Sequence, residues 1–220
     1  MVECKNPGWH LRGDFWPPQI EVGYTTAEAK GEECVERING LRAGIANTYT
    51  EDFRGVQIAP YNQSGYMEGI VIGLANNGQE TRGVSIGLWN NHAVAQRGVG
   101  VGIVQTGGDM AGVHLGALHY IKGNMTGFQA AITNSARGDM TGFQAAIFGN
   151  GTVGDMTGFQ AAIFGNITDG DMTGFQAAIG LNGAGGDMSY VQLGLMNFSG
   201  PCLLFDPIVG GVCMLRRQER

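Results

Sequence analysis

The strongest constraint on the fold of this chain is an eight-residue motif that occurs four times. Residues 123–182 contain four copies of Met-Thr-Gly-Phe-Gln-Ala-Ala-Ile. Their Thr-Gly steps begin at Thr126, Thr141, Thr157 and Thr173, so the period is 15 to 16 residues. Repeats of this length are typical of stacked coils.

The same frame extends over most of the chain, because a landmark glycine recurs every 14 to 16 residues. The landmarks are Gly40, Gly55, Gly69, Gly83, Gly98, Gly112, Gly127, Gly142, Gly158 and Gly174, with Tyr190 in the last copy. After each landmark, apolar residues alternate with others, as in the run from Val84 to Leu88. Alternation with a period of two predicts one strand per repeat with one face buried.

We expect the apolar members of this alternation to form the interior. Early repeats place Val84 and Ile86 at the two positions, and later repeats place Phe159 and Ala161 there. A packed core tolerates such an exchange of volume between adjacent positions. From Phe128 onward, aromatic rings on successive coils should stack as a ladder.

A column of asparagines marks the predicted corner of each coil. Asparagine tolerates left-handed backbone and can hydrogen-bond the neighbouring turn, which suits a bend. The column comprises Asn47, Asn62, Asn76, Asn90, Asn134, Asn150, Asn166, Asn182 and Asn197, with Gln105 and His119 as interruptions.

These patterns predict an all-β fold: a single-domain parallel β-solenoid of about eleven coils of 14–16 residues, with N- and C-terminal caps. The content of 39 glycines without a long helical period argues against an ordinary globule. The alternative is a closed antiparallel β-barrel with one strand per repeat. Parallel stacking aligns identical columns, whereas alternating strand direction would not, which favours the solenoid.

The predicted organisation is a cap at residues 1–38, the solenoid at 39–198, and a C-terminal cap and tail at 199–220. Residues 9–24 should cover the open end with an edge strand, and 25–38 should form a short helix or a loop. The apolar segment from Pro201 to Val209 should act as a lid on the last coil. The N-terminal segment has no apolar stretch that resembles a signal peptide or a membrane helix, although a signal peptide removed earlier would leave no trace in it.

Two polar columns are candidates for a ligand face that binds glycan or ice. Equally, both columns can be interstrand hydrogen-bond ladders that hold the coils in register. The columns are Thr126, Thr141, Thr157 and Thr173, and Gln129, Gln144, Gln160 and Gln176, which Ser189 and Gln192 continue in the last copy.

An acidic column is a weak candidate for Ca²⁺, because repeated carboxylates offer oxygen ligands. The column comprises Asp109, Asn124, Asp139, Asp155, Asp171 and Asp187, of which the last four are the Ca²⁺ candidates. The favoured interpretation is a Gly-Asp turn with an Asx hydrogen bond. No firm metal site and no cofactor are predicted.

The remaining polar residues point to no catalytic site. His114 and His119 lack an evident third metal ligand. Cys4 with Cys34, and Cys202 with Cys213, would each pin a cap in an exported protein, but four free thiols fit a reducing compartment equally well. No nucleophile elbow, phosphate loop or zinc signature is present, so no enzyme is predicted.

The net charge of −6 gives no nucleic-acid footprint. The repeat sequence Gly55-Val56-Gln57-Ile58, the Trp16-Pro17-Pro18 start and the closing Asn197-Phe198-Ser199-Gly200-Pro201 resemble a bacterial surface-repeat family. The Phe-Ala-Ala-Ile copies and the four cysteines depart from its pattern. The resemblance implies a bacterial cell-surface or envelope protein with no known catalytic residues.

The predicted function is a non-enzymatic scaffold that binds another protein or copies of itself. The alternatives are a glycan- or ice-binding module that uses the Thr and Gln columns, and an outer-membrane β-barrel. The sequence does not name the partner.

Overall fold

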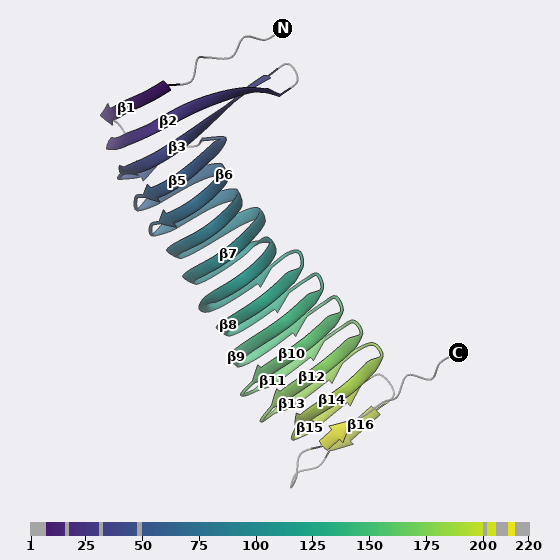
Figure 1. The fold of residues 1–220 in the computed structure, drawn as a ribbon. Helices are drawn as coiled ribbons and strands as arrows, with labels where there is room; N and C mark the ends of the chain where they lie inside the picture. Colours follow the sequence, from purple (N-terminus) through teal and green to yellow (C-terminus); the bar gives the residue numbers. More distant parts are fainter. Residues whose placement is uncertain are drawn as a thin grey trace. The chain divides into compact units, whose positions relative to one another are not determined.

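The computed structural model describes residues 8–15, 18–30, 33–47, 50–199, 202–205 and 211–213. The chain divides into two units, Met1–Ile103 and Val104–Arg220. Every regular element in the described residues is a β-strand (Figure 1). The all-β prediction is therefore confirmed.

The first unit begins with an antiparallel meander. β1 (Gly8–Phe15) pairs with β2 (Pro18–Lys30), and β2 pairs with β3 (Glu33–Gly44). An edge strand was expected within residues 9–24, and β1 and β2 are strands there. The prediction of a helix or loop at residues 25–38 is wrong, because the ends of β2 and β3 pair with each other as far as Lys30 and Glu33.

Parallel coils follow in the first unit. β3 pairs with β5 (Asp52–Ile58), and β4 (Ala46–Asn47) and β5 pair with β6 (Tyr61–Ile72), which pairs with β7 (Ala75–Ile121). The landmark glycines are register partners, as Gly40 with Gly55 and Gly55 with Gly69. Equivalent positions of successive repeats therefore lie directly above one another.

The second unit continues the parallel stacking with two strands in each later coil. The strands are β8 (Met125–Ala136), β9 (Met140–Thr152), β10 (Met156–Ala162), β11 (Gly165–Thr168), β12 (Met172–Ala178), β13 (Leu181–Ala184), β14 (Met188–Gly194) and β15 (Met196–Ser199). β10 lies between β9 and β12, and β11 lies between β9 and β13. This is a parallel β-solenoid of about eleven turns, and the barrel alternative is wrong.

Two short antiparallel strands lie against the last coil. β16 (Cys202–Phe205) pairs with β15, and β17 (Gly211–Cys213) pairs with β14. Their pairing agrees with the predicted lid. Residue 201 and residues 206–209 of that lid lie outside the described residues, as do the tail at 214–220 and Cys4. The side chains of the other three cysteines lie outside them too.

The landmark glycines are required by the close approach of successive coils. Gly158 has φ +131°, in a region that L-residues rarely adopt. A Cβ placed on Gly158 would lie 2.1 Å from the carbonyl oxygen of Gly142 on the preceding coil. A side chain at Gly158 would therefore force two coils apart.

The interior is lined by different residues from those that the alternation predicted. The buried positions lie two residues before and two residues after the landmark, and in later coils they carry Met and Gln, such as Met156 and Gln160, both fully buried. The positions occupied by Phe159 and Ala161 are only half-buried and face outward. The prediction that the Phe and Ala positions face the interior is therefore wrong. They lie on the outer face of the strand, and the Met and Gln positions lie on the inner face.

A polar interior is stable here because the buried side-chain amides of successive coils hydrogen-bond one another. Asn166 Nδ2 donates to Asn182 Oδ1 at 2.9 Å and to the carbonyl oxygen of Ala177 at 2.8 Å, and its own Oδ1 accepts from Asn150 at 2.8 Å. A buried polar group costs little when it is hydrogen-bonded. The predicted stacking of the Asn column and its hydrogen bonds to the neighbouring coil are confirmed, although the asparagines lie in strands rather than at bends.

Candidate functional site

The Gln column, half of the predicted ligand face, lies in the interior. Gln129, Gln144, Gln160, Gln176 and Gln192 have no exposed surface. Each Nε2 donates to the Oε1 of the preceding glutamine, at 3.1, 3.0, 2.9 and 2.8 Å from Gln144 to Gln192. These side chains cannot contact an outside ligand, and the alternative of an interstrand ladder is confirmed for this column.

The Thr column lies at the surface. Thr126, Thr141, Thr157 and Thr173 are exposed and are register partners on successive coils. The structure thus separates the two halves of the predicted ligand face, because Thr points outward where Gln points inward. Only the Thr row remains available to a ligand.

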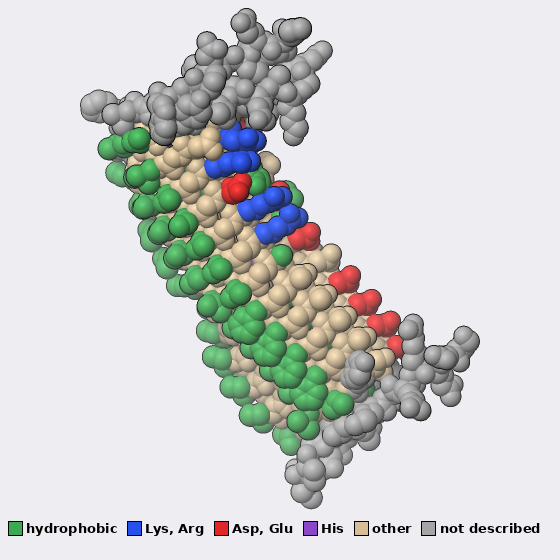
Figure 2. Space-filling view, viewed as in Figure 1, with side chains coloured by type: hydrophobic (Ala, Val, Ile, Leu, Met, Phe, Trp, Pro, Cys, Tyr) green, Lys and Arg blue, Asp and Glu red, His purple; other side chains and the backbone are tan. Residues whose placement is uncertain are grey.

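The outer surface of the second unit carries rows of apolar side chains next to the Thr row. The rings of Phe128, Phe143, Phe159 and Phe175 stack at centroid distances of 5.2, 4.9 and 5.0 Å, with interplanar angles of 5°, 3° and 14°. The predicted ladder is present, but it lies outside the coil rather than in its core. Figure 2 shows these green rows, with carboxylates along one edge.

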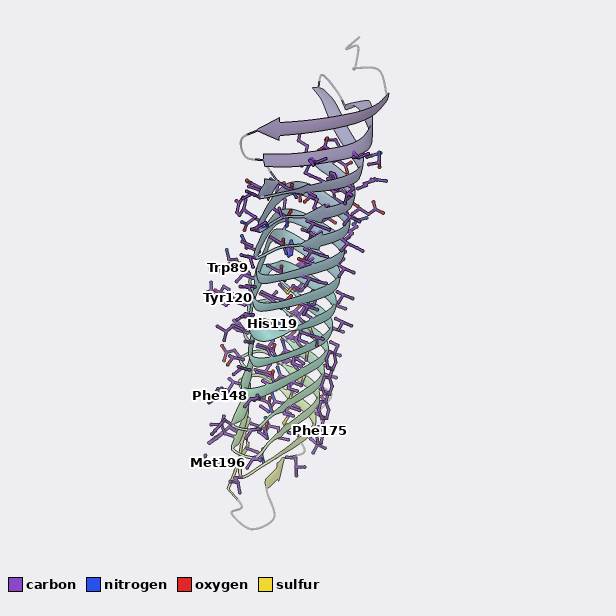
Figure 3. The ribbon with its side chains drawn as sticks, turned by 90° about the vertical axis from the view of Figure 1, so that its left-hand side faces the viewer. Trp89, His119, Tyr120, Phe148, Phe175 and Met196 are labelled. Atoms are coloured by element: carbon purple, nitrogen blue, oxygen red, sulfur yellow. The ribbon has the colours of Figure 1, made fainter. Side chains whose placement is uncertain are left out.

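A parallel row of isoleucines follows four residues after each phenylalanine. Ile132, Ile147, Ile163 and Ile179 are 38%, 50%, 47% and 67% exposed. A second aromatic pair, Phe148 and Phe164, stacks at 5.3 Å. Phe148 and Phe175 point to opposite sides in Figure 3, so both broad faces of this unit carry aromatic rings.

The first unit also presents apolar rows on its outside. Exposed members include Ile58, Ile70, Ile72, Leu74, Ile86, Leu88 and Trp89, between 37% and 57% exposed. Monomeric proteins rarely expose contiguous apolar patches larger than a few hundred Å². Both units therefore carry surface that is typical of contact with another molecule.

The Asp column fixes the turns. Asp139, Asp155 and Asp171 each accept a hydrogen bond at Oδ1 from the backbone N–H of the next aspartate in the column. The distances are 2.9 Å from Asp155 to Asp139, 2.8 Å from Asp171 to Asp155 and 2.8 Å from Asp187 to Asp171. This is hydrogen bonding of an aspartate to a neighbouring turn, as in the favoured interpretation, although the partner belongs to the following coil. One carboxylate oxygen per coil is engaged in this way.

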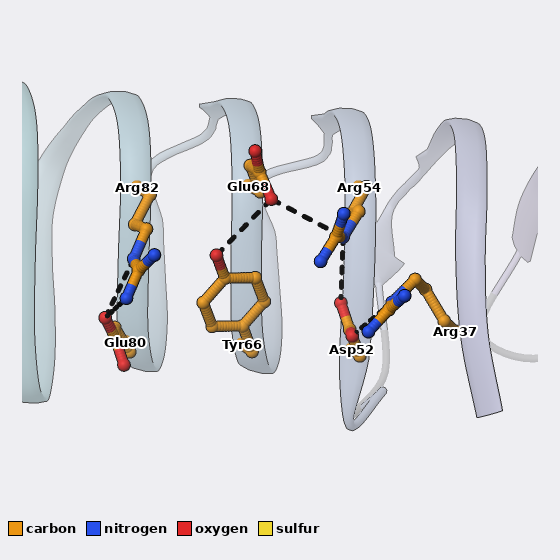
Figure 4. A network of polar contacts seen from close by, with 7 residues as sticks. All are labelled: Arg37, Asp52, Arg54, Tyr66, Glu68, Glu80 and Arg82. Carbon is orange, nitrogen blue, oxygen red and sulfur yellow. Dashed lines mark hydrogen bonds and ion pairs between the residues drawn. The ribbon is translucent and has the colours of Figure 1, made fainter. Parts of the chain in front are cut away.

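In the first unit, a network of ion pairs lies around Asp52, the repeat position that the Asp column occupies in the second unit (Figure 4). Arg37 Nε lies 2.6 Å from Asp52 Oδ2, and Arg54 Nε lies 3.4 Å from Glu68 Oε2. Burial, reinforced by the adjacent Glu68, raises the pKa of Tyr66. Partly exposed pairs of this kind contribute up to about 1 kcal/mol each, so the network is a surface feature rather than a reactive centre.

Two of the buried histidines, His114 and His119, are held neutral. Burial, followed by the nearby His119, lowers the pKa of His114 to about 4. Burial lowers the pKa of His119 to about 4 as well, although a hydrogen bond to Asn134 acts in the opposite direction. Gln105 Nε2 lies 3.1 Å from His119 Nε2, so the histidine replaces asparagine in the Asn ladder.

No reactive centre emerges from the described part of the chain. Within it, no group of three His, Cys, Asp or Glu side chains is placed to hold a metal ion. Within it, too, no helix has the length and apolar character needed to span a bilayer. The distinctive surface features are therefore the apolar rows and the Thr row.

No protein-family model, no curated protein and no solved structure matches this chain. The resemblance to a bacterial surface-repeat family stays a prediction.

Proposed function

We propose that this protein is a non-enzymatic repeat scaffold of the bacterial surface or envelope, which associates with further copies of itself through its outer sheet faces. The observation that carries the proposal is that the coil has polar side chains inside and apolar side chains outside. Amide and methionine columns fill the interior, while phenylalanine, isoleucine, leucine and valine rows stand outside. Apolar surface of this kind gains free energy when a second surface covers it.

The packing of the phenylalanines favours a protein surface over a sugar. Phe143 and Phe159 stack face to face at 4.9 Å with an interplanar angle of 3°. Their ring faces are therefore occupied by one another, and only ring edges point outward. Sugar rings bind aromatic side chains mainly through the ring face, whereas ring edges and methyl groups pack well against another apolar side-chain layer.

The charge beside the apolar rows disfavours an anionic membrane as the partner. Asp139, Asp155, Asp171 and Asp187 run along the edge of the same face. Anionic lipid headgroups repel such a row and attract basic segments instead.

The exposed Thr row supports a second candidate, ice binding. Four hydroxyl groups repeat in register at the spacing of β-strands, about 4.8 Å. Inhibition of ice recrystallisation by the full chain, and its loss in Thr141→Lys and Thr157→Lys, would support this function. Absence of inhibition at about 100 μM protein would exclude it at any useful affinity.

Sedimentation velocity of the full chain without detergent tests the proposal of self-association. From about 1 to about 100 μM we expect a concentration-dependent dimer or larger species, since affinities in this range correspond to modest interfaces. A strict monomer over the whole range would refute it. Flotation of that monomer with phosphatidylserine vesicles would instead assign the apolar rows to a membrane.

A further inference from the structure

The outer face formed by β8, β9, β10 and β12 has a ridge and a groove side by side. The ridge is the row Phe128, Phe143, Phe159 and Phe175. The groove is the row Ala130, Ala145, Ala161 and Ala177, two residues later in each strand. We call this surface the Phe–Ala face. Alternation of large and small side chains in adjacent rows lets one surface interdigitate with another.

The Phe–Ala face is large enough for a reversible dimer. Its four coils at about 4.8 Å, and seven residues across the strand at about 3.3 Å, give a flat area of roughly 450 Å². Two copies would together bury roughly 900 Å², the size of a weak, reversible interface. A second copy also has the same coil spacing, so side chains can match along the whole face.

One twofold arrangement makes the face complementary to itself. In this arrangement the twofold axis runs parallel to the direction of coil stacking. The Phe row of one copy, one residue after the landmark glycine, then faces the Ala row of the other copy, three residues after it. Each Phe ridge then lies in the Ala groove of the other copy. The Asp row at the edge projects beyond the partner, where its carboxylates stay in water.

The opposite arrangement sets like against like. With the axis across the coils, each row faces its own copy, so phenylalanines meet phenylalanines and alanines leave a gap. The Asp row would also face the Asp row of the partner, and such like-charge juxtaposition costs several kcal/mol by order of magnitude. Volume and charge therefore select the first arrangement.

We infer that a second copy of this chain covers the Phe–Ala face in a twofold dimer whose two coil stacks run side by side in the same direction. This inference rests on the proposed self-association and specifies its partner surface and orientation.

Site-specific photocross-linking tests the orientation. The photoreactive p-benzoylphenylalanine replaces Phe128, and unlabelled and ¹⁵N-labelled chains are mixed so that cross-links between copies can be recognised. Cleavage before Asp109, Asp139, Asp155, Asp169, Asp171 and Asp187 separates the coils into distinct peptides. In the covalent dimer we expect Phe128 to be joined to residues 109–138 or 139–154 of the other copy. Joining to residues 171–186, or to residues outside the Phe–Ala face, would overturn the inference.

A matched pair of variants tests the surface independently. Ala161→Glu places a charge in the groove, and Ile167→Glu places one on β11 of the same coil, at a residue that is 51% exposed. We expect the first variant to raise the dimer dissociation constant at least about 100-fold and the second less than about 3-fold, since only the first buries an unpaired charge. Equal effects would overturn the inference.

The outcomes separate the two proposals. A wild-type chain that stays monomeric in sedimentation removes both. A wild-type dimer that Ala161→Glu leaves intact, with native circular dichroism in both variants, removes only the Phe–Ala face and leaves self-association standing.

Discussion

Acid should destabilise the second unit through His114 and His119. Both rings are buried, and both have a pKa of about 4 in the folded chain. In the unfolded chain a histidine titrates near pH 6.5, so the unfolded state binds more protons between these values. The stability supplied by the neutral rings is complete above about pH 6.5 and is lost as the pH falls toward 4.

The size of the effect follows from the two pKa values. For each histidine, a fall from pH 7 to pH 4.5 should remove about 2.4 kcal/mol of unfolding free energy, or about 5 kcal/mol for the pair. The main cause is burial of the two rings, and the contact of His119 with Gln105 acts in the same direction. Gln105 Nε2 donates to the carbonyl oxygen of Leu115 at 2.7 Å and faces His119 Nε2 at 3.1 Å, so a protonated ring would set two donors against each other.

Urea unfolding monitored by circular dichroism from pH 7 to pH 4.5 measures this loss. The control is the double variant His114→Gln with His119→Asn, which restores the residues that later coils carry in the same columns. Because carboxylates titrate in both proteins, the difference between the two pH profiles isolates the histidines. Parallel profiles would refute the reasoning.

Three further substitutions, one of them matched with a control, test the packing of the strands. Gly158→Ala should lower the free energy of unfolding by at least about 3 kcal/mol, because its Cβ would collide with backbone and its φ is positive. The control is Gly183→Ala, whose Cβ would meet nothing within 4 Å and which should change the free energy of unfolding by less than about 1 kcal/mol. Equal urea midpoints of the two variants would contradict this. Asn166→Leu should cost about 3 kcal/mol or more by leaving its buried ladder partners unpaired, and a loss below about 1 kcal/mol in calorimetry would be unexpected. Glu21→Gln should cost about 3 kcal/mol in thermal unfolding, because it removes the carboxylate that is paired with the buried guanidinium of Arg42; a neutral result would show that this ion pair does not stabilise the fold.

Much of the architecture could be predicted from the spacing of residues. The landmark glycines, the Asn column and the parallel register all follow from identical residues recurring at coil spacing, and the structure places them as register partners. Strand pairing at residues 25–38 could not be read from local composition, because the long antiparallel partner β3 imposes it.

The direction in which each strand faces could not be read from alternation alone. A period of two says that Phe159 and Gln160 face opposite sides, but it does not say which side is inside. Hydrophobicity favoured burying Phe159, yet a glutamine with an identical neighbour above and below forms a ladder that removes the cost of burial. The signal that could have indicated this was the recurrence of Gln at the same position in five consecutive repeats, together with the methionine four residues before each.

Methionine oxidation tests most directly which columns line the interior. Met110, Met125, Met140, Met156, Met172 and Met188 are each at most 2% exposed, so dilute peroxide should convert them to sulfoxides at least about 10-fold more slowly in the native chain than in urea. Peptide mass spectrometry after timed quenching gives the rate at each position. Protection of all six would establish that the Met and Gln columns line the interior and that the phenylalanine rows face outward. Oxidation of the six at the rate of the unfolded chain would show that these columns are on the surface, and the proposed apolar association face would then not exist.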